Sequence, residues 1–247
     1  MATPEDAAFA AKLGAQALTA TVRSTRPLSP HLHELVLDVQ DPAVAGVPGN
    51  DIMVSVSNGE RFVRRRYSVR DVSADSLTLW IRQGHDGPGA TWAAQAQVGD
   101  ATTIIGPRGK IVLDPLADWH LFVGDEASLS AFYRLAESID PPGQAIFILV
   151  LSEPDDFVPP ASIDGIGYTA IFVDRNIAGS SPLLDALAAF EFPLGDGHAY
   201  LFGEFSEMRQ VQAALLDRGL AADAISLKAF WRRGRENRDH GEPDKEV

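Results

Sequence analysis

The chain has 247 residues and none of them is cysteine. Disulfides, thiolate nucleophiles, cysteine-bound zinc and iron–sulfur clusters are therefore excluded. If the protein moves electrons, an organic cofactor or a metal with other ligands has to carry them. The sequence also lacks the run of roughly 20 apolar residues that a membrane-spanning helix needs. Its first residues show neither a basic region nor an apolar signal core. We expect a cytoplasmic protein that does not contact membrane.

Positive charge is scarce as well. The formal net charge is −13 and the sequence pI is about 4.8. This balance disfavours nucleic acid as a partner, because its backbone needs a dense positive surface. Two basic clusters stand out against it: Arg61, Arg64, Arg65, Arg66 and Arg70, and Arg232, Arg233, Arg235 and Arg238. Among six histidines only His31 and His33 lie close together, without a third ligand at a recognisable spacing, so we expect no metal site.

The first part of the chain, residues 16–116, has the pattern of an antiparallel barrel or sandwich. Segments such as 51–56 and 76–82 alternate apolar and polar residues, and turn clusters of Gly, Pro, Asn and Asp separate them. Short alternating strands at this spacing are typical of such folds. An Ala-rich stretch at 89–96 favours one helix between the strands.

The pattern changes after residue 116. Continuous apolar runs at 119–123, 145–151, 168–173 and 199–202 alternate with helical segments up to residue 236. Such runs indicate a parallel sheet with helices on both faces. Residues 1–15 are predicted to form a short helix or a frayed end, and we treat 1–15 and 237–247 as flexible termini.

The most informative segment runs from Arg65 to Arg70. In a strand, alternate side chains share a face, so Arg65 and Tyr67 point one way while Ser68 and Arg70 point the other. A flavin needs an aromatic plane, hydrogen-bond donors and a cation for its diphosphate, which Tyr67, Ser68 and an arginine can supply. The alternative is a solvated edge strand whose arginines prevent aggregation. Of the arginines, Arg66 is the one we least expect to touch a flavin.

A glycine-rich loop opens the helix of the first domain. Gly87 precedes its first turn, where unpaired N–H groups and the positive end of the helix dipole favour a diphosphate. Ala90 is small enough for close approach, Thr91 can add a hydroxyl, and Trp92 follows. A helix that merely needs a turn before it is the alternative. A further turn, Gly106-Pro107-Arg108-Gly109, stands just before the change of domain.

Two turns follow strands of the second domain. The fingerprint G-x-G-x-x-G is absent, but Gly124-Asp125-Glu126 and Gly203-Glu204 each end an apolar strand. Ligands of such sheets bind beyond the carboxyl ends of the strands. Asp125 either caps the next helix or lies near nicotinamide and ribose, because its charge disfavours an adjacent phosphate. Phe230 and Trp231 end the last strand, where an aromatic covers a flavin ring or packs in the core.

Taken together, these motifs resemble the siderophore-interacting, FAD-binding ferric-siderophore reductases. Residues 65–70 are similar to the family's R-x-Y-[ST]-x-R flavin motif, and 87–93 to its G-P-A-x-x-W-A segment with one small-residue difference. The turns G-P-x-G, G-D-E and G-E are matched at 106–109, 124–126 and 203–204. Residues 230–234 resemble the closing Y-W-R-x-G. Six motifs occur in the family's order and span nearly the whole chain.

The resemblance implies a ferredoxin-reductase-like fold, in which a six-stranded FAD-binding barrel precedes a nucleotide-binding domain with a parallel sheet. The residues that it assigns to FAD and its diphosphate are Arg65, Tyr67, Ser68, Arg70, Gly87, Ala90, Thr91 and Trp92. Those that it assigns to NADPH or NADH are Gly124, Asp125, Glu126, Gly203 and Glu204. Arg232 and Trp231 would meet the ferric siderophore. No side chain is expected to act as acid or base, because the flavin carries the electrons.

Three positions depart from the family pattern. The family continues G-D-E with Thr-Ala-x-Pro-Ala, whereas residues 127–131 here are Ala-Ser-Leu-Ser-Ala. The displaced hydroxyl and the missing proline leave the choice between NADPH and NADH open. Gln83 replaces a histidine before the flavin loop, with His85 two positions on. Phe230 replaces a tyrosine and lacks its hydroxyl.

The sequence therefore predicts a reductase that passes electrons from NAD(P)H through FAD to Fe(III) in a siderophore and releases Fe(II). One alternative is an NAD(P)H reductase on the same scaffold that serves ferredoxin or flavodoxin. The other is a colourless module that binds siderophores without flavin.

Overall fold

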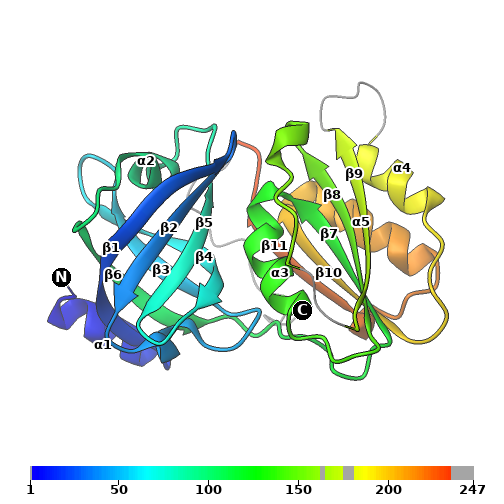
Figure 1. Ribbon diagram of the computed structural model, residues 1–247, viewed down its shortest axis with the longest axis horizontal. Coiled ribbons are helices and arrows are strands. Elements are labelled where there is room, and N and C mark those ends of the chain that lie inside the picture. Colours follow the sequence, from blue (N-terminus) through cyan, green and yellow to red (C-terminus); the bar gives the residue numbers. More distant parts are fainter. Residues whose placement is uncertain (1, 162–164, 175–180, 235–247) are drawn as a thin grey trace. The chain divides into compact units, whose positions relative to one another are not determined.

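The computed structural model describes residues 2–161, 165–174 and 181–234, and it divides into two compact units between Val112 and Leu113 (Figure 1). This division lies a few residues before the predicted boundary at 116. Residues 113–116 belong to the second unit because Asp114 bonds to it. Its backbone N–H donates to the Tyr200 hydroxyl at 2.7 Å, and its carboxylate lies 3.2 Å from His198 Nδ1. The predicted terminus 237–247 lies outside the described residues.

The first unit is a closed antiparallel barrel with strand order β1-β2-β5-β4-β3-β6, which confirms the six-stranded prediction. Helix α2 joins β5 to β6. The barrel interior is filled by alternate residues such as Leu35, Val54 and Leu79, all fully buried. The elements are α1 (Pro4–Lys12), β1 (Gln16–Ser29), β2 (Leu32–Val39), β3 (Asp51–Ser57), β4 (Phe62–Val72), β5 (Ser76–Arg82), α2 (Pro88–Gln95) and β6 (Ala101–Arg108).

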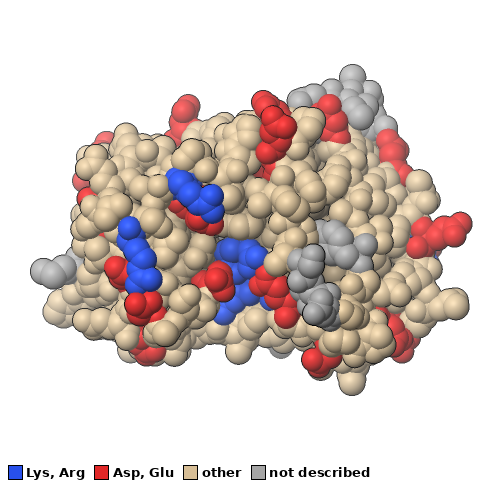
Figure 2. Space-filling view, in the orientation of Figure 1, with Lys and Arg blue, Asp and Glu red and all other residues tan. Residues whose placement is uncertain are grey.

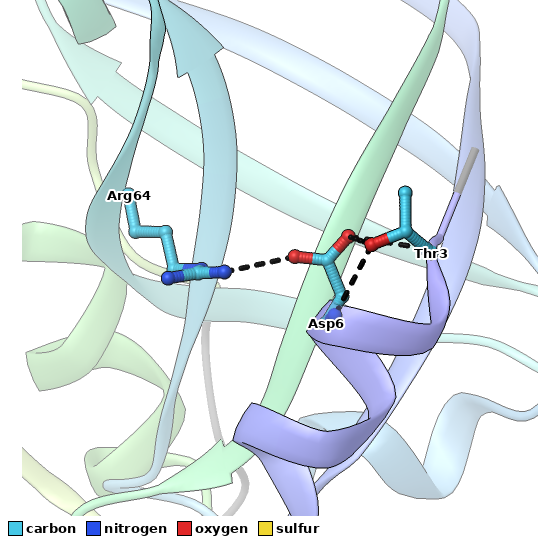
Figure 3. A network of polar contacts seen from close by, with 3 residues as sticks. All are labelled: Thr3, Asp6 and Arg64. Carbon is cyan, nitrogen blue, oxygen red and sulfur yellow. Dashed lines mark hydrogen bonds and ion pairs between the residues drawn. The ribbon is translucent and has the colours of Figure 1, made fainter.

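Residues 4–12 form helix α1, the short helix that was one of the two alternatives for this segment. Thr3 and Asp6 make a capping box, in which each side chain accepts the other residue's backbone N–H. Asp6 also pairs with Arg64 of β4, from Nη2 to Oδ1, at 2.9 Å (Figure 3). The Arg64 guanidinium lies 4.2 Å from the ring centre of Phe9. These contacts attach α1 to the barrel.

The second unit has a five-stranded parallel sheet with order β11-β10-β7-β8-β9. This confirms the predicted class, and the strands run further than the apolar runs alone indicated. Its described elements are β7 (Trp119–Asp125), α3 (Leu129–Ala136), β8 (Gln144–Leu151), β9 (Gly167–Asp174), α4 (Pro182–Ala189), β10 (Gly197–Glu204), α5 (Phe205–Asp217) and β11 (Ile225–Trp231). No helix in the described part of the chain is both long and apolar enough to cross a membrane.

The two faces of this sheet differ in composition. Aliphatic residues of β7, β8 and β10 pack against α4 and α5. The other face, which α3 covers, is aromatic. Fully buried Phe122 lies with ring centres 4.9 Å from Phe147, 5.1 Å from Tyr200 and 5.4 Å from Phe132 of α3. Aromatic pairs at these distances are favourable beyond their buried area, so the rings fix α3 on the sheet.

Two histidines extend this aromatic face toward the amino ends of the strands. His120 of β7 and His198 of β10 are register partners, and both are buried. His198 contacts Asp114 through Nδ1 and Ser226 through Nε2. Burial, with a smaller contribution from His198, lowers the pKa of His120 to about 4. In the folded chain the His120 imidazole is therefore uncharged at pH 7.

We expect His120→Phe to remove part of the acid sensitivity of folding. Because the folded pKa lies below the unfolded value of 6.5, the unfolded chain binds more protons between about pH 6.5 and 4. Stability of the wild type should fall through that window by on the order of 2 kcal/mol from this group. Thermal unfolding at pH 7.5 and at pH 4.5 checks this. A stability difference between variant and wild type that is the same at both pH values would contradict it.

Candidate functional site

Strand β4 carries the arginine motif. In its pairing with β3, Val54 lies opposite Arg65 and Ile52 opposite Tyr67. Paired residues of antiparallel strands share a face, and Ile52 and Val54 belong to the barrel interior. Arg65 and Tyr67 therefore both point inward; the alternation predicted that they share a face, and the structure shows which face it is. Ser68, opposite Asp51, lies on the other face.

Arg66 forms an ion pair within the barrel. Its Nε and Nη2 donate to the two carboxylate oxygens of Asp51 at 3.1 and 2.7 Å. The Asp51 side chain is only 2% exposed, so its charge needs this bidentate partner. Arg64 is held on the outside by Asp6. That Arg66 is the arginine least expected to touch a flavin stays a prediction.

Tyr67 lies against the first turn of α2. A Cβ added to Gly89 would stand 1.9 Å from the Tyr67 hydroxyl oxygen and 3.6 Å from Cγ of Arg65. The Tyr67 and Trp92 rings lie 6.5 Å apart. Burial raises the pKa of Tyr67, so its hydroxyl stays protonated. The structure thus brings three predicted flavin residues, Arg65, Tyr67 and Trp92, together at one end of the barrel.

The start of α2 has the character of an anion site. Its N-cap is Gly87, which provides no capping side chain, and Pro88 occupies the first turn. Gly89 and Ala90 are buried, and the Gly89 backbone lies close to Tyr67. Helix starts without a capping side chain leave N–H groups for an anion. Thr91, the fourth predicted residue here, is exposed.

Arg70 lies apart from this group. The register of β4 and β5 shifts between Val69 and Asp71, and the Arg70 guanidinium lies 5.1 Å from the ring centre of Trp80. The indole of Trp80 donates to Glu34 at 2.9 Å on the outside of the barrel. Ser68 and Arg70 are therefore not brought to the face that carries Tyr67.

The second unit has its topological switch point between β7 and β10, because the chain leaves β7 toward β8 and later returns on the other side. Ligands of open parallel sheets bind at such a point, beyond the carboxyl ends of the strands. Gly124 and Gly203 lie there. A Cβ on Gly124 would stand 2.2 Å from the Phe202 carbonyl oxygen, so only glycine lets the two strands approach this closely.

Three carboxylates predicted to meet the nucleotide surround this point. Asp125, Glu126 and Glu204 are all buried. Asp125 accepts from the backbone N–H of Ala127 at 2.9 Å, and Glu126 accepts from the hydroxyl of Ser152. Glu204 caps α5 by accepting from the backbone N–H groups of residues 206 and 207 at 2.6 and 3.0 Å. Each carboxylate thus has a structural partner.

The end of β11 reaches the same place. The indole N–H of Trp231 donates to Asp125 Oδ2 at 2.7 Å. The Arg232 guanidinium lies 4.6 Å from the ring centre of Phe205. Phe230 stacks on Phe202 at 5.3 Å, the core packing that we kept as the alternative for this aromatic.

Sequence reasoning missed two of these partners. Asp51 is the one acid at the start of an otherwise alternating apolar strand, and three consecutive arginines occur in the next strand along the chain; that combination was the available signal. Ser128 donates its hydroxyl to the Phe202 carbonyl. This hydroxyl lies one position later than the threonine of the family pattern, and it connects η2 (Glu126–Ser128) to β10. Within the described ranges no group of three or more metal-ligating side chains is assembled.

These features define the two-domain fold of the ferredoxin-reductase-like class. Among solved structures, a ferredoxin NADP+ reductase from Neisseria gonorrhoeae with bound FAD and NADP shares the fold. Its TM-score is 0.67 at 16% identity, over 87% of this chain and 99% of that one. A siderophore utilization protein from T. fusca gives 0.79 at 25% identity, over 92% and 96%.

The particular family follows from the sequence matches. Residues 47–111 match the siderophore-interacting FAD-binding domain, and residues 117–234 match the siderophore-interacting protein model. The ferric vibriobactin reductase ViuB of Vibrio cholerae is 30% identical over 73% of this chain and 68% of its own length. The chain belongs to the siderophore-interacting protein family, and its first unit carries the family's FAD-binding domain.

The two outward arginines of β4 should differ sharply in their effect on stability. Arg66→Ala leaves the buried Asp51 charge without its bidentate partner and should cost about 3 kcal/mol of unfolding free energy, the lower end for broken buried pairs. Arg64→Ala breaks a more exposed pair and should cost about 1 kcal/mol or less. Urea unfolding of both variants measures this. Equal losses would show that the Arg66–Asp51 pair does not hold the barrel as described.

Proposed function

We propose that this protein is a flavin-dependent reductase that passes electrons from NADPH or NADH to Fe(III) in a ferric siderophore and thereby releases Fe(II). The observation that carries the proposal is the position of Arg65 and Tyr67 against the start of α2. The barrel there offers a cation, an aromatic ring and helix N–H groups within one site. These are the groups that a flavin and its diphosphate require.

The fit of FAD to these residues can be described group by group. Arg65 and the first turn of α2 would hold the diphosphate, and Tyr67 would lie beside the ring system. The protonated Tyr67 hydroxyl can donate a hydrogen bond but carries no charge. FAD, when bound, supplies the chemistry of accepting two electrons from a nicotinamide and releasing them singly. The protein's contribution is to bind, to orient and to exclude water.

The nicotinamide nucleotide would lie at the carboxyl ends of β7 and β10. Gly124 and Gly203 lie at the carboxyl ends of these strands, where ligands of open parallel sheets bind. The buried acids around this point disfavour a phosphate in direct contact. A nicotinamide and its ribose are therefore better suited to this place than the diphosphate. Both NADPH and NADH satisfy these groups.

Electrostatics favours an anionic chelate as substrate. Acidic side chains are spread over the face seen in Figure 2, whereas Lys and Arg gather in a few places. On a chain of net charge −13, such local cations are where an anion is attracted. Arg232 of the second unit, whose guanidinium lies 4.6 Å from the ring centre of Phe205, is a candidate for this role. The proposed substrate is accordingly a ferric siderophore, and the relative named above, a ferric vibriobactin reductase, supports this.

The proposal is tested with purified protein supplied with FAD. Bound flavin should give a visible spectrum, and anaerobic addition of NADPH or NADH should bleach it. Ferric citrate with an Fe(II) trap should then yield two Fe(II) for each nucleotide consumed, because a hydride carries two electrons. Flavin that stays oxidised with both nucleotides would refute the proposal. Bleaching followed by electron transfer to ferredoxin, but not to ferric chelates, would favour the ferredoxin-linked alternative.

A pair of variants of β4 tests the flavin site itself. Arg65→Ala should raise the dissociation constant of FAD about tenfold or more, because a hydrogen-bonded charge is lost. Arg64→Ala is the matched control, since its side chain points to Asp6 on the outside. FAD titration followed by tryptophan fluorescence measures both constants. The same affinity in both variants would rule out Arg65 as the phosphate ligand.

A further inference from the structure

Three consecutive residues at the end of β11, Trp231, Arg232 and Arg233, are each held by a different element. We call them the C-terminal segment. Trp231 donates its indole N–H to Asp125 at the end of β7. Arg232 lies over Phe205 at the start of α5. The backbone N–H of Arg233 donates to Glu204 Oε1, at the end of β10, at 3.1 Å.

The first of these bonds spans a neighbouring strand. In the sheet order, β10 separates β11 from β7, so the Trp231 side chain crosses β10 to reach Asp125. It does so beside Gly203, where an added Cβ would stand 3.4 Å from Asp125 Oδ2. The pairing of β10 and β11 shifts register at this point, between Gly203 and Glu204. Such an irregularity re-aims side chains at the end of a strand.

The acids of the two turns are occupied by these contacts. Asp125 accepts from residue 127 with one oxygen and from Trp231 with the other. Glu204 caps α5 with one oxygen and holds Arg233 with the other. We propose that Asp125 and Glu204 are positioning residues that fix the C-terminal segment across the switch point. This differs from the expectation that their carboxylates face the nucleotide directly.

The anchored segment would present its arginines to the ferric chelate, a role that rests on the proposed function. Through the Trp231 indole and the Arg233 backbone N–H, Asp125 and Glu204 fix the backbone that carries two adjacent arginines at the carboxyl edge of the sheet, in a chain of net charge −13. A backbone held in one geometry presents its arginines to an anion with less loss of conformational freedom than a backbone that is not held. Asp125 and Glu204 would thus act on the ferric chelate through the segment, without touching the chelate.

Trypsin cleavage after Arg232 and Arg233 tests the anchoring without reference to activity. Cleavage requires the segment to leave its contacts, and its rate then follows the population of the open form. Trp231→Phe keeps the ring but removes the N–H donor, and Asp125→Asn weakens the acceptor. Each should speed cleavage at these two bonds by about tenfold or more, as expected for a lost hydrogen bond to a charged group. Mass spectrometry of the intact products identifies the bonds.

The control is a second indole–carboxylate bond in the same chain, Trp80 to Glu34 in the barrel. Trp80→Phe should leave cleavage at Arg232 and Arg233 unchanged. Rates are compared at temperatures equally far below each melting temperature, which removes any difference in global stability. The double variant Asp125→Asn/Trp231→Phe should be cleaved no faster than the faster single variant, because both changes remove one bond. Wild-type cleavage rates in both single variants, or additive effects in the double variant, would overturn the anchoring.

Steady-state kinetics with ferric citrate separates positioning from direct contact. If Asp125 acts through the segment, Asp125→Asn and Trp231→Phe should raise the KM for ferric citrate by the same factor. If Asp125 contacts the nucleotide, Asp125→Asn alone should raise the KM for NADPH or NADH, and that result would overturn the positioning role. A chain without any reductase activity would refute the proposed function, while the cleavage rates would still decide whether the segment is anchored.

Discussion

The buried carboxylate of Asp51 governs how the barrel presents its arginines. A charge that is nearly inaccessible to water requires a cation in hydrogen-bonding contact, and Arg66 supplies it with two bonds. Because strand residues alternate, fixing Arg66 on the outside sends Arg65 and Tyr67 to the inside. One structural ion pair thus sets the orientation of the side chains on which flavin binding depends.

The second unit uses its buried acids in a related way. Gly124 allows β7 and β10 to lie close together, and the carboxylates that follow them, Asp125 and Glu204, each bond to a neighbouring turn as well as to the end of β11. These acids look like ligand-binding groups when read along the chain. In the folded unit their first partners are N–H groups of the protein, as expected for charges removed from solvent.

Periodicity predicted the architecture well because it depends on local patterns. Alternation gave the barrel and the orientation of Arg65 against Arg66, and continuous apolar runs gave the parallel sheet. Contacts between distant residues were not predictable in this way. Nothing near Trp231 in the sequence points to Asp125, which is more than a hundred positions earlier. The helical N-terminus was ambiguous for the same reason, because Asp6 finds Arg64 only in the folded barrel.

The contact between Gly89 and Tyr67 links two positions that the family pattern treats separately. An alanine in place of Gly89, as in the G-P-A pattern, would set a methyl group 1.9 Å from the Tyr67 hydroxyl oxygen of this chain. With an alanine at this position, the Tyr67 ring would have to stand further from the helix. Positions 89 and 67 are therefore coupled. A loop with alanine at position 89 would bring its methyl group into conflict with the Tyr67 ring unless the tyrosine strand changed with it.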